Sequence, residues 1–115
     1  MIKIGTDIVA IDRVDKALKK FGDRYKDRFL TQNEQKLSSK VESIAGYWAS
    51  KEAISKALGC GIGNELRFDD IEIYKDSKNA PHFRLKESSK FKIKQSSLSI
   101  SHDGGFAIAV VVIEL

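Results

Sequence analysis

The sequence predicts an α+β fold in which a small, mostly antiparallel sheet packs against a long buried helix and shorter helices. A strand pattern opens the chain at residues 2–11, where successive positions alternate between two faces. Two further strand segments close the chain at 97–102 and 106–114, and the Asp-Gly-Gly turn between them is typical of a β-hairpin. Between these ends, residues 42–58 carry apolar side chains nearly all round a helix, which indicates a buried helix.

Local capping and turn signals predict the shorter elements. Asp12 is the candidate N-cap of a helix over residues 13–21. Thr31, followed three residues later by Glu34, forms a capping-box pattern that opens a short helix. Gly59 ends the long helix. Farther along the chain we expect two strands and a short basic helix, at residues 70–75, 82–85 and 86–94.

Composition limits the classes of protein to which the chain can belong. Its 115 residues, 42% of them hydrophobic, predict a single globular domain over residues 1–115. Lys and Arg number 20 against 16 Asp and Glu, a mild excess that suits an anionic cofactor, an acidic protein or nucleic acid. Cys60 is the one cysteine, which excludes an internal disulfide and favours a reducing, cytoplasmic location. We find neither a signal-peptide pattern nor an apolar run of membrane-spanning length, so we expect no membrane association.

The last strand is apolar on both of its faces. Residues 106–113 read Phe-Ala-Ile-Ala-Val-Val-Val-Ile, and a strand of this kind needs cover on both sides. A domain this small has a limited core with which to provide that cover. A monomer can cover such a strand at its centre, but a strand at the end of a small sheet more often needs a partner subunit. We therefore expect the chain to form an oligomer.

Asp7 is an unusual residue for the interior of a strand, where Asp is disfavoured. It stands among apolar residues, and Gly5 leaves space two positions away on the same face. Asp7 is therefore a candidate functional acid. The alternative is an acid at the end of the strand that is solvated or caps a turn.

The buried helix carries one polar lane. At about 100° per residue, Ala45, Ala49, Glu52 and Lys56 fall within a narrow arc, so two small residues lie beside two opposite charges. The alternative reading of Glu52 and Lys56 is an ordinary i,i+4 pair contributing about 0.2–0.5 kcal/mol. If Asp7 were adjacent, it would form a minimal magnesium site with Glu52, because Mg²⁺ uses one or two carboxylates together with water and substrate phosphate. Lys56 would then meet a phosphate oxygen as a point charge.

Two other segments have candidate chemistry. His102 ends a strand and enters a turn, where it is either a phosphate donor or proton carrier, or a turn residue hydrogen-bonded to backbone. Gly59 and Gly61 lie in a glycine-rich loop after the helix, a position that excludes a P-loop. Such a loop can still line a pyrophosphate through backbone N–H groups.

Several segments, taken together, match one known pattern. Gly5-Thr-Asp-Ile8, followed by Arg13, is one of them. Residues 48–59, WASKEAISKALG, fit the pattern W/F-x-x-K-E-A-x-x-K-A, and residues 99–107, SISHDGGFA, fit S-x-S-H-x-x-x-Y/F-A. Residues 28–31 fit as well, and the order, spacing and total length agree over essentially the whole chain. The chain thus resembles the small bacterial holo-acyl-carrier-protein synthases of the 4'-phosphopantetheinyl transferase superfamily.

The resemblance implies a role for each matching residue. Asp7 and Glu52 match the family's metal-binding acids, which take Mg²⁺. Lys56 matches the helix lysine that meets the phosphates of coenzyme A and joins the two acids in catalysis. His102 matches a residue near the 3'-phosphate of the nucleotide, and Arg13 matches a position that docks the acidic carrier protein.

The resemblance also extends to the assembly and to the loop after the helix. Family members of this size are trimers with active sites between subunits, so a homotrimer is expected. Gly59 and Gly61 are assigned to cofactor binding, and Arg28 joins the residues that dock acyl carrier protein. Two positions depart from the family. Tyr47 stands where relatives often carry Arg, and residues 79–81, Asn-Ala-Pro, replace a more usual Gly-Lys-Pro, so the 3'-phosphate is expected to be held differently.

The implied reaction is attack by a serine of the carrier protein on the β-phosphorus of coenzyme A, which transfers phosphopantetheine and releases 3',5'-ADP. Glu52 and a metal-bound water are both candidates for the base. Two rival hypotheses remain open. The chain would be a nucleic-acid-binding module if the basic stretch 86–94 bound DNA or RNA, although that stretch has one aromatic, Phe91, and no recognition motif. It would be an inactive trimeric scaffold if it bound no coenzyme A.

Overall fold

The computed structural model describes residues 1–115 and confirms the predicted α+β class. The strands are β1 (Ile2–Ala10), β2 (Ile71–Lys75), β3 (Pro81–Leu85), β4 (Gln95–Asp103) and β5 (Phe106–Glu114). The helices are α1 (Ile11–Phe21), α2 (Asp23–Phe29), α3 (Gln32–Leu37), α4 (Val41–Ala57) and a short 3-10 helix, η1 (Phe68–Asp70). None of these helices is both long enough and apolar enough to span a bilayer.

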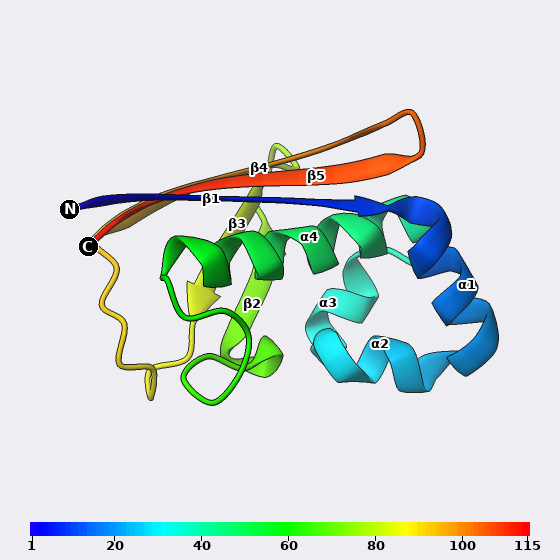
Figure 1. Cartoon of the computed structure of the whole chain (residues 1–115), viewed down its shortest axis with the longest axis horizontal. Coiled ribbons are helices and arrows are strands. Elements are labelled where there is room, and N and C mark those ends of the chain that lie inside the picture. Colours follow the sequence, from blue (N-terminus) through cyan, green and yellow to red (C-terminus); the bar gives the residue numbers. More distant parts are fainter.

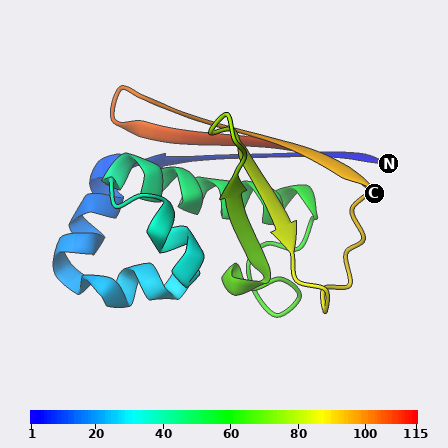
Figure 2. The ribbon, with the colours of Figure 1, turned by 180° about the vertical axis from the view of Figure 1, so that it is seen from behind.

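The strands form two antiparallel sheets. β1, β5 and β4 make the main sheet in that spatial order, and β2 pairs only with β3. The main sheet lies across α4, while α1, α2 and α3 gather at one end of the molecule (Figure 1). The view from behind shows the β2–β3 hairpin crossing α4 (Figure 2). The long helix is therefore enclosed by the sheet on one side and by the hairpin and shorter helices on others, as its all-round apolar pattern predicts.

Small residues bring α4 and the sheet into close contact. A Cβ atom on Gly5 of β1 would lie only 1.9 Å from the carbonyl oxygen of Ala53, so the strand and the helix touch backbone to backbone. A Cβ atom on Gly46 would likewise lie 2.8 Å from Ile100 of β4. The fully buried Ala107 and Ala109 of β5 line the sheet between these two contacts. Small side chains on both partners thus set the distance between α4 and the sheet.

The capping box at the start of α3 is confirmed, whereas the predicted cap of α1 is wrong. The Thr31 N–H donates to Oε1 of Glu34 at 2.7 Å, and the Glu34 N–H donates to Oγ1 of Thr31 at 3.2 Å. Asp12 lies inside the first turn of α1 and pairs with Lys16 instead of capping the helix. β1 runs straight into α1, and the N–H of Ile11 donates to the Gly105 carbonyl at 2.9 Å, so backbone from the β4–β5 turn takes the place of a side-chain cap.

Helix α2 was not among the predicted elements. Gly22, with φ of 59°, separates it from α1, and aromatic packing stabilises it. The ring centroid of Phe29 lies 5.1 Å from that of Tyr25 on the same helix and 5.1 Å from that of Trp48 on α4. Seven residues are too few for a helix to be stable alone, so this one depends on contacts that come from distant parts of the chain.

The predicted helix over residues 86–94 is also wrong, because this segment forms a loop. Ser89 makes local bonds that compete with a helix: its N–H donates to the Lys86 carbonyl at 2.9 Å, and its hydroxyl accepts from the Phe91 N–H at 3.2 Å. The predicted strands on either side are confirmed as β3 and β4. At the β4–β5 turn Gly104 and Gly105 both have positive φ, at 59° and 84°, as a two-residue hairpin turn requires.

The face of the main sheet that points away from α4 is uncovered in the single chain (Figure 1). It is largely apolar along β1 and β5, whereas β4 adds Ser97, Ser99 and Ser101 to it. Along β5 the residues alternate strictly between buried and exposed. On β1, Ile4 is 66% exposed. The large apolar side chains exposed on this outer face are Ile2, Ile4, Ile8, Phe106, Ile108, Val110 and Val112. The last strand therefore has cover on one face only, and an exposed apolar patch of this kind is typical of an interaction surface.

Replacing Gly5 with Ala should destabilise the fold, because the new methyl group would overlap the Ala53 carbonyl and push β1 away from α4. We expect a loss of about 1–3 kcal/mol or more in the free energy of unfolding, the usual scale for overpacking. Gly63→Ala is the matched control, since a Cβ atom there meets nothing within 4 Å and its φ is not positive. Denaturant unfolding of both variants measures the difference, and equal stability would refute the close contact.

Candidate active site on β1 and α4

Asp7 and Lys56 form a salt bridge between the strand and the helix. Asp7 points from β1 toward α4, two residues beyond the Gly5 contact, and its side chain is only 15% exposed. The ammonium of Lys56 donates to Oδ1 of Asp7 at 2.9 Å and to the Thr6 carbonyl at 3.2 Å. The ordinary i,i+4 pair is therefore not what forms, because Lys56 reaches Asp7 of the sheet and not Glu52 of its own helix.

Glu52 is the third charged residue beside Asp7 and Lys56, and it has no ion-pair partner of its own. It lies one helical turn before Lys56 and is partly buried. Burial raises the pKa of its carboxyl group, and the nearby Asp7 raises it further, while Lys56 and Arg13 act in the opposite direction. The two acids are thus close enough to repel one another, and the single lysine between the elements is already engaged by Asp7.

This donor set fits Mg²⁺. Both acids offer oxygen atoms, which hard cations prefer, and their mutual repulsion leaves the site short of positive charge. No group of three or more His, Cys, Asp or Glu side chains gathers anywhere in the structure. A closed site of the structural zinc type is therefore not built here, whereas a site with two carboxylates has room for the water and phosphate oxygens that Mg²⁺ takes.

Gly59 and Gly61 lie just after α4, at the end of the helix that carries Lys56. Their positive φ values, 80° and 67°, let the chain turn sharply. The Gly59 N–H donates to the Lys56 carbonyl at 3.0 Å and the Gly61 N–H to the Ser55 carbonyl at 3.2 Å. Both N–H groups thus close the helix end. What the glycines offer a ligand is the open space around their α-carbons, where a Cβ atom would meet nothing within 4 Å.

His102 lies apart from the other three residues. It is on β4 opposite Ala107 of β5, and the partner of Ala107 on the other side is Val9 of β1, so the whole of β5 separates His102 from β1. His102 lines a hollow of about 160 Å³ together with Ser43 of α4. Ser43 and Glu52 are nine residues apart, which puts them on opposite sides of the helix at about 100° per residue. Within one chain, His102 and the acid pair therefore face different sides of α4.

Tyr47, one of the positions where this chain differs from the family pattern, lines the same hollow as His102. Tyr47 is only 1% exposed, and its hydroxyl is the one buried side-chain polar atom without a hydrogen-bond partner. Burial raises its pKa, and Glu34 adds to this effect. Lys75 and Asn79 from the β2–β3 hairpin line the hollow as well. Lys75 is thus a basic residue of this hollow that sequence reasoning missed, because it depends on how the hairpin folds over α4.

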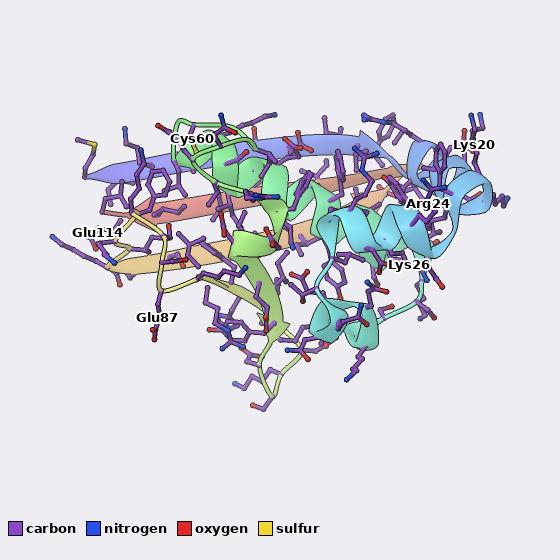
Figure 3. The ribbon with its side chains drawn as sticks, turned by 90° about the horizontal axis from the view of Figure 1, so that it is seen from below. Lys20, Arg24, Lys26, Cys60, Glu87 and Glu114 are labelled. Atoms are coloured by element: carbon purple, nitrogen blue, oxygen red, sulfur yellow. The ribbon has the colours of Figure 1, made fainter.

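Arg13 lies on α1, near enough to Glu52 to act on its pKa, and Arg28 lies on the next helix, α2. The Arg13 guanidinium lies 5.9 Å from the ring centroid of Trp48, one turn before Glu52 on α4. Arg28 of α2 lines a hollow with Phe21, Arg24 and Tyr25. Lys20, Arg24 and Lys26 mark the same end of the molecule in Figure 3. Sequence reasoning missed Arg24 because it missed α2, although the four-residue spacing between Arg24 and Arg28 is the signal that places both on one helix face.

Replacing Glu52 with Gln should stabilise the metal-free protein at neutral pH. Because folding raises the pKa of Glu52, its ionisation costs stability as the pH rises through the folded-state value, and the neutral amide avoids this cost. We expect a higher Tm than wild type near pH 7, and a difference that shrinks as the pH falls below the ordinary Glu range, to about pH 3. Calorimetry across this range measures the effect, with the exposed Glu87→Gln as control. A difference independent of pH would contradict it.

Comparisons with known proteins assign the chain to a family. The family model of the 4'-phosphopantetheinyl transferase superfamily matches residues 3–111. A holo-[acyl-carrier-protein] synthase of Campylobacter fetus subsp. fetus is 58% identical over 113 residues, covering 96% of this chain and 98% of the relative. The corresponding enzyme of Sulfurovum sp. is 53% identical over 115 residues, covering 98% and 97%.

Solved structures match just as closely. The Helicobacter pylori holo-[acyl-carrier-protein] synthase in complex with coenzyme A superposes with a TM-score of 0.94 at 52% identity, covering 96% of this chain and 99% of that one. The Bacillus anthracis enzyme, solved with CoA (3',5'-ADP), gives a TM-score of 0.84 at 38% identity, covering 97% and 95%. The chain therefore belongs to the 4'-phosphopantetheinyl transferase superfamily, as an enzyme of its holo-acyl-carrier-protein synthase group.

Proposed function

We propose that this chain transfers the 4'-phosphopantetheine group from coenzyme A to a serine of apo acyl carrier protein and releases 3',5'-ADP. The observation that carries the proposal is the meeting of Asp7 from β1 with Glu52 and Lys56 from α4. Relatives at more than half identity are named for this activity, and a neighbour of matching fold was solved with coenzyme A. We propose that residues 1–115 act as one transferase domain in the cytoplasm.

The transfer balances as a single displacement at phosphorus. The serine oxygen of the carrier protein forms a bond to the β-phosphorus, and the bond from that phosphorus to the oxygen bridging the α-phosphate breaks. The bridging oxygen leaves with 3',5'-ADP, and the serine proton passes to a base. Glu52, which lies beside Asp7 at this site, stays one of the two candidates for this base.

Asp7 and Glu52 are the residues that would hold Mg²⁺. When bound, the ion would neutralise charge on the pyrophosphate. Lys56 is suited to meet a phosphate oxygen, because its side chain is 54% exposed and can turn away from Asp7 when other charges arrive. Its ammonium would add to the stabilisation of charge that develops on the leaving group.

The outer face of the main sheet and the place of His102 both support a homotrimer with shared sites. The uncovered apolar side chains of β1 and β5 suit an interface with copies of the chain. His102 and the acid pair lie on different sides of α4, so a coenzyme A molecule that touches both would bind between two subunits. Around a three-fold axis each subunit would then contribute to two sites.

The helices α1 and α2 are suited to dock an acidic carrier protein. Arg13 and Arg28 lie there, and Lys20, Arg24 and Lys26 add positive charge at the same end of the molecule (Figure 3). Arg13 is close enough to Glu52 to lower its pKa, so a partner docked at this end would lie next to the acid pair. Complementary charge of this kind raises the rate of association.

The proposed reaction is tested by mass spectrometry of apo carrier protein after incubation with the enzyme, coenzyme A and Mg²⁺. We expect a gain of one phosphopantetheine mass, and release of 3',5'-ADP in equal amount. Asp7→Ala and Glu52→Ala should each lower the rate by at least about 100-fold, the scale on which transition-state charge stabilisation is lost. Glu87→Ala, an exposed acid in the loop between β3 and β4, is the matched control.

The same assay separates the alternatives. A wild-type chain that binds coenzyme A but modifies no carrier protein would overturn the proposed transfer. A chain that binds no coenzyme A would be the inactive scaffold. Full activity in either acid variant would refute the metal site while leaving the transfer intact.

A mixture of two inactive variants tests whether sites are shared between subunits. Asp7→Ala and His102→Ala should each have low activity alone. Co-expressed subunits should regain about a quarter of wild-type activity, because about one site in four then combines an intact Asp7 with an intact His102. A mixture no more active than its separate components would show that each site lies within one chain.

Reversing the charge of Arg28 tests the docking face. Arg28→Glu should raise the KM for carrier protein by about tenfold and leave the KM for coenzyme A unchanged, because the residue faces the partner and not the nucleotide. The wild-type KM for carrier protein should also rise with salt. Lys78→Glu, on the exposed β2–β3 turn, is the matched control. Equal effects of the two variants would remove Arg28 from the docking face.

A further inference from the structure

Lys51, the neighbour of Glu52 in the sequence, has no exposed surface and points into the protein. Its ammonium donates to the Phe29 carbonyl at 2.7 Å, to Oε1 of Glu34 at 2.8 Å and to the Phe68 carbonyl at 3.0 Å. An ammonium has three N–H donors, so all of them are used. Lys51 therefore has no donor left for a phosphate, although it stands next to a candidate ligand of the metal.

Glu34 is equally well satisfied. Its side chain has no exposed surface, and Oε1 accepts from the Thr31 N–H as well as from Lys51. Oε2 accepts from the Ile73 N–H at 2.7 Å. The pair thus ties α4 to four other elements at once: the end of α2, the start of α3, η1 and β2. Because every hydrogen bond of this buried ion pair is made, replacing only one of its two residues would strongly destabilise the fold.

The opposite side of α4 packs on the inner face of the main sheet. There Ala53 lies against Gly5 of β1 and Gly46 against Ile100 of β4. The buried strand residues Val9, Leu98, Val111 and Ile113 belong to the same core. These apolar contacts set how close the helix lies but are not directional, whereas the hydrogen bonds of Lys51 and Glu34 are.

We propose that Lys51 is a positioning residue, which with Glu34 fixes the rotation of α4 about its axis and so holds Glu52 beside Asp7. The inference rests on the proposed function, which gives Glu52 its role at the metal. Lys51 and Glu52 project about 100° apart from the same turn. For a carboxylate about 6 Å from the helix axis, a rotation of about 10° is a displacement of about 1 Å. Displacements of this size cost about 100-fold in rate.

The aromatic rings of Phe29, Phe68 and Trp48 connect Lys51 to Arg13. Phe29 and Phe68 supply two of the three acceptors of Lys51, and their ring centroids lie 5.1 Å and 5.2 Å from that of Trp48. Trp48 in turn lies under Arg13, 5.9 Å from its guanidinium. Lys51 thus also holds in place the surface from which Arg13 acts on Glu52.

The test compares Lys51→Met with the double variant Glu34→Gln/Lys51→Met. The single variant leaves the buried Glu34 carboxylate without its cation, so its Tm should be much lower than that of the wild type. The double variant removes both charges and should recover part of that difference. Its Mn²⁺ affinity, measured by electron paramagnetic resonance with coenzyme A present, should still be at least tenfold weaker than wild type, and its kcat about 100-fold lower. Mn²⁺ serves as the probe because it takes the same oxygen ligands as Mg²⁺.

Ile113→Val is the control for loss of stability alone, because Ile113 is buried on β5, where it pairs with Lys3 and Ser96 and not with a strand bonded to Glu34. At equal Tm it should keep wild-type Mn²⁺ affinity and kcat. A double variant that matches Ile113→Val in both measurements would overturn the inference and leave the pair a stabilising contact only. This comparison holds even if Lys51→Met does not fold. Failure of the proposed function is a different outcome, in which the wild type itself neither binds Mn²⁺ nor modifies the carrier protein, and the positioning role falls with it.

Discussion

The close contact between Gly5 of β1 and the Ala53 carbonyl of α4 is the constraint on which the rest of the site depends. A strand and a helix normally keep a layer of side chains between them, and here that layer is missing because one partner is glycine and the other alanine. Asp7 lies two residues along the strand, so its carboxylate reaches the helix while still in the sheet. Without this approach the acid of the strand and the acid of the helix would be too far apart for the shared cation that we propose.

The molecule contains two charged clusters that differ in how completely they are satisfied. Lys51 and Glu34 are fully buried, and every donor and acceptor has a partner, as a structural ion pair requires. Asp7, Glu52 and Lys56 are partly exposed, and Glu52 has no cation of its own. An incompletely balanced group on an accessible surface is where a metal and a phosphate can still bind. The difference separates the two lysines of the helix motif, of which one faces the protein interior and the other faces solvent.

Local patterns predicted most of the elements, and the errors have two causes. The capping box of Thr31 and Glu34, the long helix and the closing hairpin depend on nearby residues, and all three were predicted. Helix α2 was missed because distant aromatic rings stabilise it, and the cap at Asp12 was wrong because the Gly105 carbonyl takes its place. The predicted helix over 86–94 is wrong because the local hydrogen bonds of Ser89 compete with helix formation.

The sequence by itself determined the order of the elements, the two acids and the family pattern that joins them, because periodicity, capping and motif spacing are local properties of the chain. Only the tertiary structure decided which side chains meet. It paired Lys56 with Asp7, directed Lys51 to Glu34, and put His102 on the far side of α4 from the acid pair. The physical reason is that strand order and helix rotation are set by packing between distant segments, and neither leaves a signal in the spacing of neighbouring residues.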